Sequence, residues 1–275
     1  ESKVADTIIN KNKVADYLYE ISYNSINYEN AYKYFEDQLD NIPAGACSSV
    51  RKGEFYGRNL DWIYSEAADF IIKVPRINGR KASIGMASMA DSLTKEIVES
   101  GVYTDAYEKL PFLTFDGINE DGVFINTNVV PLDREVTTGT VPTETLEVTL
   151  PSTMIPRYVL DHFDTAEAAA DWLVNEANVY APRTVKLNQE IHVMLADANK
   201  TYVVEFINNV AVKIDVSSRP WMTNFYLTDA LFNEDDTVIY NSVTPHGNGL
   251  ERFDLIANSY DTANTMGGMR NLMDS

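Results

Sequence analysis

Apolar positions in the first 40 residues recur at spacings that fit a helical period better than strict alternation. We therefore predict one or two amphipathic helices over residues 4–39. The segment Asn41-Ile42-Pro43-Ala44-Gly45 breaks this pattern just before Cys47. The apolar positions that carry the helical pattern are Val4, Ile8, Val14, Leu18, Ile21, Ile26, Tyr32, Phe35 and Leu39.

From Cys47 onward, short apolar runs bounded by turn residues predict β-strands. Strong turn signals lie at Lys52-Gly53, Asn119-Glu120-Asp121-Gly122, Asp197-Ala198-Asn199-Lys200 and Asn208-Asn209. The predicted strands are Cys47 to Val50, Phe55-Tyr56, Asp69 to Val74, Ser83 to Ser88, Leu113 to Phe115, Val123 to Val130, Glu190 to Ala196, Thr201 to Ile207 and Val210 to Val216. Helices are predicted near Ser152 to His162, from Thr165 to Asn178 with Asp164 as its cap, and from Gly249 towards Tyr260.

Strands and helices that come in runs, rather than in strict alternation, are typical of the α+β class. The strands Ile191 to Leu195 and Val203 to Phe206 are largely apolar on both faces, which indicates that a further layer covers each side of the sheet. We therefore predict a four-layer αββα sandwich, with helices outside two antiparallel sheets.

Composition narrows the classes of partner. The 275 residues include 22 Lys and Arg against 41 Asp and Glu, so the net charge of -19 argues against nucleic acid as a ligand. No apolar run reaches the roughly 18 residues that a membrane-spanning helix needs. The sequence leaves open the compartment and whether copies of the chain associate.

The single cysteine, Cys47, has no partner for a disulfide or for a Cys-x-x-Cys zinc or redox site. A hairpin turning near Lys52-Gly53 would bring Cys47 close to Arg58 and Asp61, and a neighbouring guanidinium favours a thiolate. Two simpler interpretations stand beside this one: Cys47 as a small buried apolar residue, and Arg58 with Asp61 as an ordinary surface ion pair. We expect no metal and no cofactor.

Several motifs in the same order resemble the choloylglycine hydrolase family of N-terminal nucleophile amidases, which includes bile salt hydrolases and penicillin V acylases. The motifs are Cys47-Ser48-Ser49-Val50, Tyr56-Gly57-Arg58-Asn59-Leu60-Asp61-Trp62, Gly117-Ile118-Asn119-Glu120-Asp121-Gly122-Val123, His192 to Asp197 with Val203-Val204-Glu205-Phe206, Met222-Thr223-Asn224 and Gly249-Leu250-Glu251-Arg252-Phe253. The resemblance spans residues 47 to about 255 and implies a linear amide hydrolase on an αββα fold that needs no catalytic histidine.

The resemblance also implies a role for each matching residue. Cys47 is expected to be the nucleophile, Arg58 the neighbour of its sulfur and Asp61 the partner of its α-amine. By the same comparison Asn224 resembles the oxyanion-hole asparagine, and Arg252 resembles the arginine that completes the set. For the remaining family asparagine, Asn128 is preferred to Asn126 because it lies closer to Pro131.

The family further implies that the chain is cut before Cys47, so that residues 1–46 form a helical propeptide and residues 47–275 the hydrolase domain. The small pair Gly45-Ala46 would let the Cys47 sulfur reach the Ala46 carbonyl. Relatives carry further strands after the position of Arg252, so part of that sheet is expected to be missing here. A small amide is the expected substrate, and a non-catalytic binding protein on the same fold is the alternative.

Overall fold

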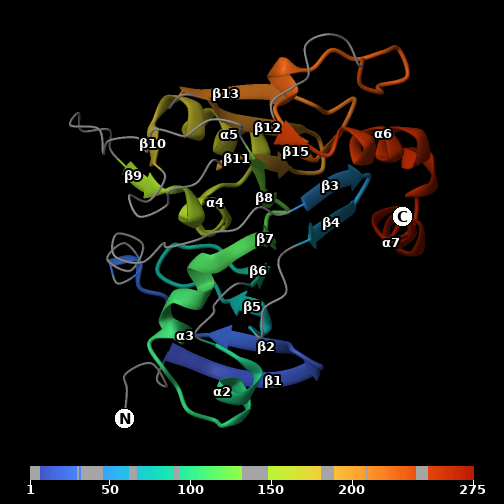
Figure 1. Cartoon of the computed structure of the whole chain (residues 1–275). Coiled ribbons are helices and arrows are strands. Elements are labelled where there is room, and N and C mark those ends of the chain that lie inside the picture. Colours follow the sequence, from blue (N-terminus) through green and yellow to red (C-terminus); the bar gives the residue numbers. More distant parts are fainter. Residues whose placement is uncertain are drawn as a thin grey trace.

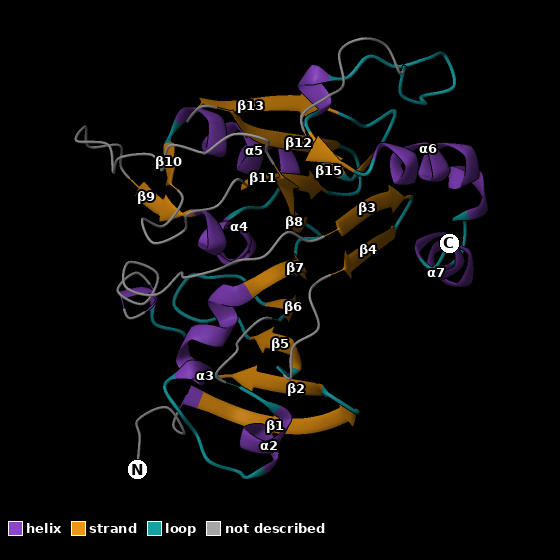
Figure 2. Cartoon of the chain, viewed as in Figure 1, coloured by secondary structure: helices purple, strands orange, loops and turns teal. Residues whose placement is uncertain are grey.

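The computed structural model describes residues 7–29, 31, 46–61, 67–88, 93–131, 148–180, 189–207, 210–239 and 247–275. In Figure 1 these residues form four layers, which run across the view from helices through a large sheet and a small sheet to a second group of helices. The same layers stand out by element type in Figure 2. The predicted α+β, αββα architecture is confirmed.

Nine strands of the described chain form the large sheet. All pairings between its neighbours are antiparallel except that of β2 with β5, which is parallel. In spatial order the strands are β1 (Ile8–Ala15), β2 (Leu18–Tyr23), β5 (Asp69–Val74), β6 (Ser83–Ala87), β7 (Thr114–Asn119), β8 (Phe124–Pro131), β11 (Gln189–Ala196), β12 (Thr201–Ile207) and β13 (Val210–Asp215).

The small sheet has the order β14 (Trp221–Met222), β3 (Ala46–Lys52), β4 (Phe55–Asp61). Helices α4 (Ile155–His162) and α5 (Ala166–Asn175) pack on the large sheet, whereas α6 (Leu250–Ser259) and α7 (Met266–Met273) pack on the small one. The shorter elements are α2 (Lys95–Glu99), α3 (Ala106–Lys109), the parallel pair β9 (Val148–Pro151) and β10 (Ala177–Tyr180), and the antiparallel pair β15 (Asn224–Phe225) and β16 (Gly247–Asn248).

The helical prediction for residues 4–39 is wrong for residues 8–23, whereas residues 28, 29 and 31 are helical as predicted. Residues 8–23 form the hairpin β1–β2, because Tyr19, Ile21 and Tyr23 point into the core with a period of two. The helical pattern includes Val14, which is 53% exposed, and omits the two tyrosines, which are buried. Residues 1–6, 30 and 32–45 lie outside the described residues.

Two smaller predictions also change. Thr165, not Asp164, caps α5 through a hydrogen bond from Ala168 N to its Oγ1 at 3.1 Å, while Asp164 pairs with Lys81. Helix α7 was not predicted, since its Met-Gly-Gly-Met sequence has low helix propensity. It forms because Met269 and Leu272 bury their side chains against the small-sheet side of the core.

Two apolar clusters hold the layers together. The larger lies between the large sheet and α4 and α5, and the hairpin residues Tyr19, Ile21 and Tyr23 belong to it. Phe70 of β5 and Tyr107 of α3 are also buried in this cluster. The second cluster lies on the small-sheet side and includes residues of α6 and α7. Between the two sheets, by contrast, several buried side chains are polar.

Candidate active site

The small sheet brings Asn224 beside Cys47, although 177 residues separate them in sequence. Strand β14 pairs antiparallel with β3, with Trp221 opposite Val50 and Met222 opposite Ser49. Continuing this register by two residues places Asn224 level with Cys47. There the backbone N–H of Cys47 donates to Asn224 Oδ1 at 2.6 Å, and both residues are buried. The Asn224 Nδ2 group donates to Val129 O at 2.6 Å.

The guanidinium of Arg252, in the first turn of α6, joins Cys47 and Asn224 from the helical side. Its Nη1 donates to the carbonyl oxygen of Cys47 and, at 3.0 Å, to Ser48 Oγ. Its Nη2 donates to Asn224 Oδ1 at 2.8 Å. The same amide oxygen therefore accepts from the nitrogen of Cys47 and from Arg252, which fixes the orientation of the Asn224 side chain.

Gly249 makes room for this guanidinium. The residue caps α6 with a φ of 85°, which L-residues rarely adopt, and a Cβ there would lie 2.5 Å from Arg252 Nη2. The glycine of the motif Gly249-Leu250-Glu251-Arg252 therefore leaves the space that the Arg252 guanidinium occupies.

Arg58 lies on the same face of the β3–β4 hairpin as Cys47. Ser49 is the direct partner of Arg58 and Leu60 the partner of Cys47, so Cys47 and Arg58 are diagonal neighbours. Within the described residues Arg58 does not hydrogen-bond to Cys47. Its Nη2 donates to Thr127 O at 2.8 Å, its Nη1 lies 3.3 Å from Asp116 Oδ2, and its buried Nε has no described partner.

Asp116, on β7, was not identified from the sequence. Burial raises the pKa of this carboxyl above its ordinary value, although the adjacent Arg58 charge acts in the opposite direction. The pair therefore brings a guanidinium to the inter-sheet layer together with a carboxylate that ionises less readily than usual.

A chain of amide and hydroxyl groups continues across the inter-sheet layer from Ser49. The Ser49 hydroxyl donates to Asn128 Oδ1 at 3.1 Å and accepts from Asn126 Nδ2. Asn128 Nδ2 in turn donates to Thr223 O at 2.9 Å, so Asn128 reaches the peptide bond that precedes Asn224. Asn126 lies one step further away, on the Ser49 hydroxyl, and Asn128 is the one of the two that is bonded to the Asn224 segment.

His192 holds the same carbonyl oxygen from β11. Its Nε2 lies 2.8 Å from Thr223 O, and since a carbonyl only accepts, Nε2 carries the hydrogen. Its Nδ1 faces Glu205 Oε1 at 3.7 Å, and both side chains are fully buried. The Glu205 carboxylate also accepts from Leu227 N at 2.5 Å and Thr228 Oγ1 at 2.7 Å, so it anchors the chain just after Asn224.

The remaining sequence candidates are placed less fully. Asp61 ends β4 opposite Ala46, the residue before Cys47, and only its backbone is described. His246 and Trp62 lie outside the described residues. His162 is exposed at the end of α4, where its Nδ1 lies 2.8 Å from Tyr158 O.

Sequence reasoning missed several members of this layer, among them Ser49, Asp116, Glu205 and Thr223. Glu205 and His192 did leave a signal, because each is a polar residue with apolar neighbours on both sides in its strand, and a buried polar group requires a partner. The partners themselves depend on strand register, which the local sequence does not encode.

The described residues hold no group of three or more His, Cys, Asp or Glu side chains placed to bind a metal ion. None of their helices combines the length and apolar character needed to cross a bilayer.

The layers and the buried polar site define the class of the protein: it has the fold of the N-terminal nucleophile hydrolases. A conjugated bile acid hydrolase from Clostridium perfringens has this fold, and the two superpose with a TM-score of 0.53 at 18% identity, over 84% of this chain and 74% of the other. A variant of that enzyme gives a TM-score of 0.48 at 17% identity, over 84% and 75% of the two chains. Penicillin V acylase from Agrobacterium tumefaciens gives 0.35 at 19% identity, over 66% and 44%.

Residues 47–224 match the family model of the linear amide C–N hydrolases, choloylglycine hydrolase family. The chain belongs to this family, and it is accordingly a hydrolase of linear amide C–N bonds. No curated protein matches the chain in sequence. The family match begins at Cys47 itself.

Proposed function

We propose that the protein is a cysteine amidase whose nucleophile, Cys47, becomes the first residue of the active chain when the Ala46–Cys47 bond is cleaved by the protein itself. The observation that carries this proposal is the hydrogen bond from the Cys47 nitrogen to Asn224 Oδ1 at 2.6 Å. The atom that would become the α-amine is already held by an acceptor, in a buried polar site at the point where the family match starts.

Self-cleavage would proceed through a thioester. The Cys47 sulfur adds to the carbonyl carbon of Ala46, the C–N bond breaks, and the freed nitrogen takes up the proton of the thiol. Water then hydrolyses the thioester, which leaves a carboxylate on Ala46 and restores the thiol. Ala46 is the first residue of β3 and pairs with Asp61, so the sheet holds both sides of the bond. The Asp61 carboxylate would be the partner of the new amine.

In the cleaved enzyme, the α-amine of Cys47 would be the base for its own thiol. An α-amine has a pKa of about 7.7–8.0, so a useful fraction is neutral near pH 7. The sulfur attacks the amide carbonyl of the substrate, and the second N–H of Asn224 Nδ2 donates to the developing oxyanion. The amine product leaves with the proton from the α-amine, and water hydrolyses the acyl thioester to the free acid.

The surrounding residues would orient these groups rather than react. The two terminal nitrogens of the planar Arg252 guanidinium would donate to the Cys47 carbonyl oxygen and to the Asn224 amide oxygen, and would so fix the two oxygens relative to each other. Arg58 supplies positive charge on the face of the thiol, and its buried Nε is the donor suited to a thiolate. Asn128 acts one step away, through the Thr223 carbonyl.

For the substrate we infer an amide that joins an acyl or bile acid to a small amine. The family is one of linear amide hydrolases, and the relative with the similar fold is a conjugated bile acid hydrolase. Glycocholate, penicillin V, an N-acyl ethanolamide and an N-acyl homoserine lactone form the panel that separates the substrate classes.

The test compares the intact masses of the wild type, Cys47→Ala and Cys47→Ser after prolonged incubation. Wild type should lose the mass of residues 1–46 and show Cys47 as a new amino terminus, whereas Cys47→Ala should stay whole. Cys47→Ser replaces the thiol with a hydroxyl, which is a weaker nucleophile, and should cleave far more slowly, if at all. Wild-type protein that stays intact and releases no amine from any member of the panel would refute the proposal.

A further inference from the structure

The segment before Cys47 is built into the body of the enzyme. We infer that this segment remains bound after cleavage, as a separate chain that completes the edge of the large sheet, so that the active enzyme has two chains. This inference rests on the proposed cleavage between Ala46 and Cys47, but it is carried by a different set of contacts, those of residues 7–31.

Backbone pairing supplies the first contact. Strand β2 pairs in parallel with β5, from Leu18 opposite Asp69 to Ser22 opposite Lys73, and Asp69 N donates to Tyr17 O at 2.8 Å. In Figure 1 the hairpin β1–β2 forms the lower end of the large sheet. Loss of the hairpin would turn β5 into an edge strand with its backbone donors and acceptors exposed, which favours aggregation.

Core packing supplies the second contact. Tyr19, Ile21 and Tyr23 are at most 3% exposed and belong to the same apolar cluster as Phe70 and Ile72 of β5. The Tyr23 hydroxyl donates to Tyr107 O at 2.7 Å, deep in that cluster. Removing the hairpin would open this cluster to water and leave the Tyr107 carbonyl without the Tyr23 donor, and both changes cost free energy.

Tyr28 supplies the third contact, against helix α4. Its hydroxyl donates to Asp161 Oδ2 at 2.7 Å, and Arg157 Nη2 donates to the other carboxylate oxygen at 2.5 Å. Burial, reinforced by the adjacent carboxylate, holds the pKa of Tyr28 well above its ordinary value, so the hydroxyl keeps its proton. Asp161 is fully buried, and without Tyr28 one oxygen of a buried carboxylate would lose its donor.

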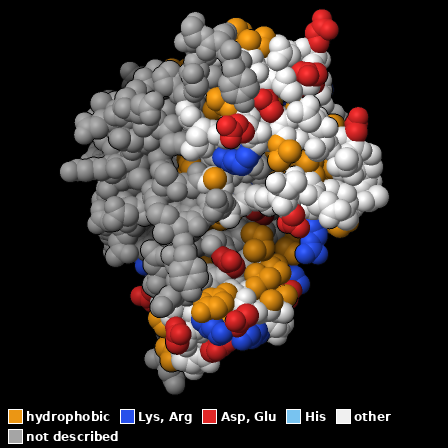
Figure 3. All heavy atoms as spheres, turned by 45° about the vertical axis from the view of Figure 1, so that its right-hand side comes forward, with side chains coloured by type: hydrophobic (Ala, Val, Ile, Leu, Met, Phe, Trp, Pro, Cys, Tyr) orange, Lys and Arg blue, Asp and Glu red, His pale blue; other side chains and the backbone are white. Residues whose placement is uncertain are grey.

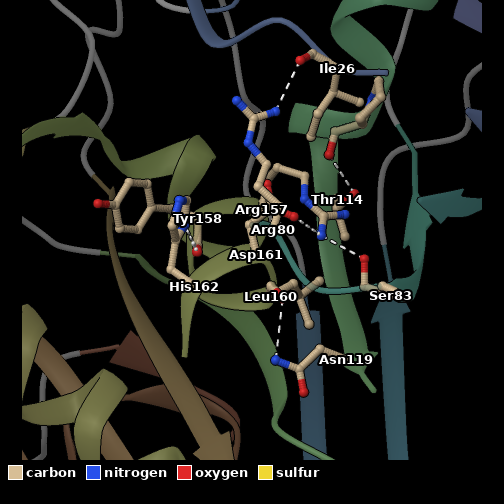
Figure 4. A network of polar contacts seen from close by, with 12 residues as sticks. Ile26, Arg80, Ser83, Thr114, Asn119, Arg157, Tyr158, Leu160, Asp161 and His162 are labelled. Carbon is tan, nitrogen blue, oxygen red and sulfur yellow. Dashed lines mark hydrogen bonds and ion pairs between the residues drawn. The ribbon is translucent and has the colours of Figure 1, made fainter. Parts of the chain in front are cut away.

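Arg80 and Arg157 connect this anchor to the body. Figure 4 shows the Arg157 guanidinium between the Asp161 carboxylate and the Ser83 hydroxyl, and the Arg80 guanidinium pointing to the carbonyl of Ile26. The Arg80 guanidinium also lies 4.7 Å from the centre of the Tyr28 ring. The segment is therefore held at residues 26–28 by a buried polar network as well as at residues 18–23 by the sheet.

Ion pairs on the surface add little to this attachment. Figure 3 shows acidic and basic side chains close together at the lower end of the molecule, where Figure 1 places the hairpin and α2. Lys13 pairs with Glu99 at 2.7 Å, and Lys95 with Asp16 at 2.5 Å. These pairs are exposed and salt-sensitive, so the attachment should survive high ionic strength.

The experiment separates retention from self-cleavage by using two forms of the full chain. One is the wild type after self-cleavage, and the other is Cys47→Ala with a site for a sequence-specific protease inserted between residues 31 and 46, which is then cut by that protease. In each, denaturing mass spectrometry counts the chains and size-exclusion chromatography in 1 M NaCl tests whether they travel together. Failure of the wild type to cleave would affect only the proposed function, because the second form still reports on retention.

Two substitutions of the same kind within the segment sharpen the test. Ile21→Ala removes a fully buried side chain, whereas Ile9→Ala removes one that is 64% exposed. Ile21→Ala should raise the dissociation constant of the cut segment by at least about 30-fold, and Ile9→Ala by less than about twofold. Co-elution of the two chains, with this difference between the variants, is the expected result. A segment that elutes as a separate peptide in native buffer while residues 47–275 stay folded would overturn the inference.

Discussion

The backbone nitrogen of Cys47 is held by the side-chain oxygen of Asn224, 2.6 Å away. The contact exists because β14, only two residues long, sets the register of the following residues against β3. A single amide side chain thereby faces both the nitrogen of the proposed nucleophile and the Arg252 guanidinium, and its Nδ2 group lies on the other side.

Replacing Asn224 with Ala should lower kcat/KM by about 10²–10³-fold, because the proposed oxyanion donor and the acceptor for the proposed α-amine are lost together. KM should change little, because the bound substrate carries no oxyanion until the sulfur attacks its carbonyl carbon. Steady-state kinetics on the best substrate of the panel measures the effect. Asn175→Ala, an exposed asparagine of α5, is the matched control and should retain full activity. Equal activity of the two variants would remove Asn224 from the mechanism.

Gly249→Ala should reduce activity by displacing the Arg252 guanidinium, since the added Cβ meets Nη2 at 2.5 Å and the φ of 85° strains an L-residue. We expect a loss of about tenfold or more in kcat/KM together with a loss of about 1 kcal/mol in the free energy of unfolding. Kinetics and urea unfolding check the two effects.

Gly267→Ala is the control for that substitution. A Cβ at Gly267, in helix α7, meets nothing closer than Thr265 Oγ1 at 3.9 Å. This change should leave activity unchanged and stabilise the protein by up to about 1 kcal/mol, because alanine has the higher helix propensity. If Gly249→Ala behaved like Gly267→Ala, the close approach of Arg252 would have no functional role.

Local patterns were enough to predict much of the β-structure. Strands β5 (Asp69–Val74) and β12 (Thr201–Ile207) have the predicted bounds, because β-branched and aromatic residues fill each run and turn residues flank it. The hairpin β1–β2 was mispredicted because one of its faces is exposed and its buried face consists largely of tyrosine, which the apolar count underweighted.

The candidate site was predictable in part, for a related reason. Cys47 and Arg58 lie on one hairpin, so a turn at Gly53 was sufficient to bring them to one face. Asn224 and Arg252 entered by resemblance to a family, and their contacts with Cys47 depend on pairing between distant strands. The hydrogen bonds of His192 and Asn128 to one carbonyl oxygen depend on the register of β8 with β11, where these two residues are direct partners.

His192 and Asn128 should be energetically coupled, because both donate to Thr223 O. His192→Ala and Asn128→Ala should each lower the free energy of unfolding by about 1–3 kcal/mol, as each leaves buried groups without partners. A double-mutant cycle measured by urea unfolding should give a coupling energy of at least about 0.5 kcal/mol. His162→Ala, at the exposed end of α4, should show no coupling with Asn128→Ala. Additive effects of the first pair would mean that the shared carbonyl does not link them.

Asp116 should make the free energy of unfolding depend on pH in one direction, which follows from the raised pKa of its carboxyl. Burial raises the pKa of Asp116, so the folded state binds its proton more tightly than the unfolded chain, in which the pKa is about 3.9. The folded protein therefore holds more protons at this site between the two pKa values, and its stability falls as the pH rises through that window. Asp116→Asn cannot ionise, so the free energy of unfolding of the variant minus that of the wild type should increase with pH across it.

Asp215 provides the opposite case and serves as the control for Asp116. Hydrogen bonds from Lys200 and Ser217 lower the pKa of Asp215 to about 2, so its stabilising effect is present above the unfolded value and is lost as the pH falls. For Asp215→Asn, the difference from the wild type should therefore decrease as the pH rises from about 2 to 4. Urea unfolding from pH 2.5 to 7 measures both differences. The same sign of slope for the two variants would show that burial does not raise the pKa of Asp116.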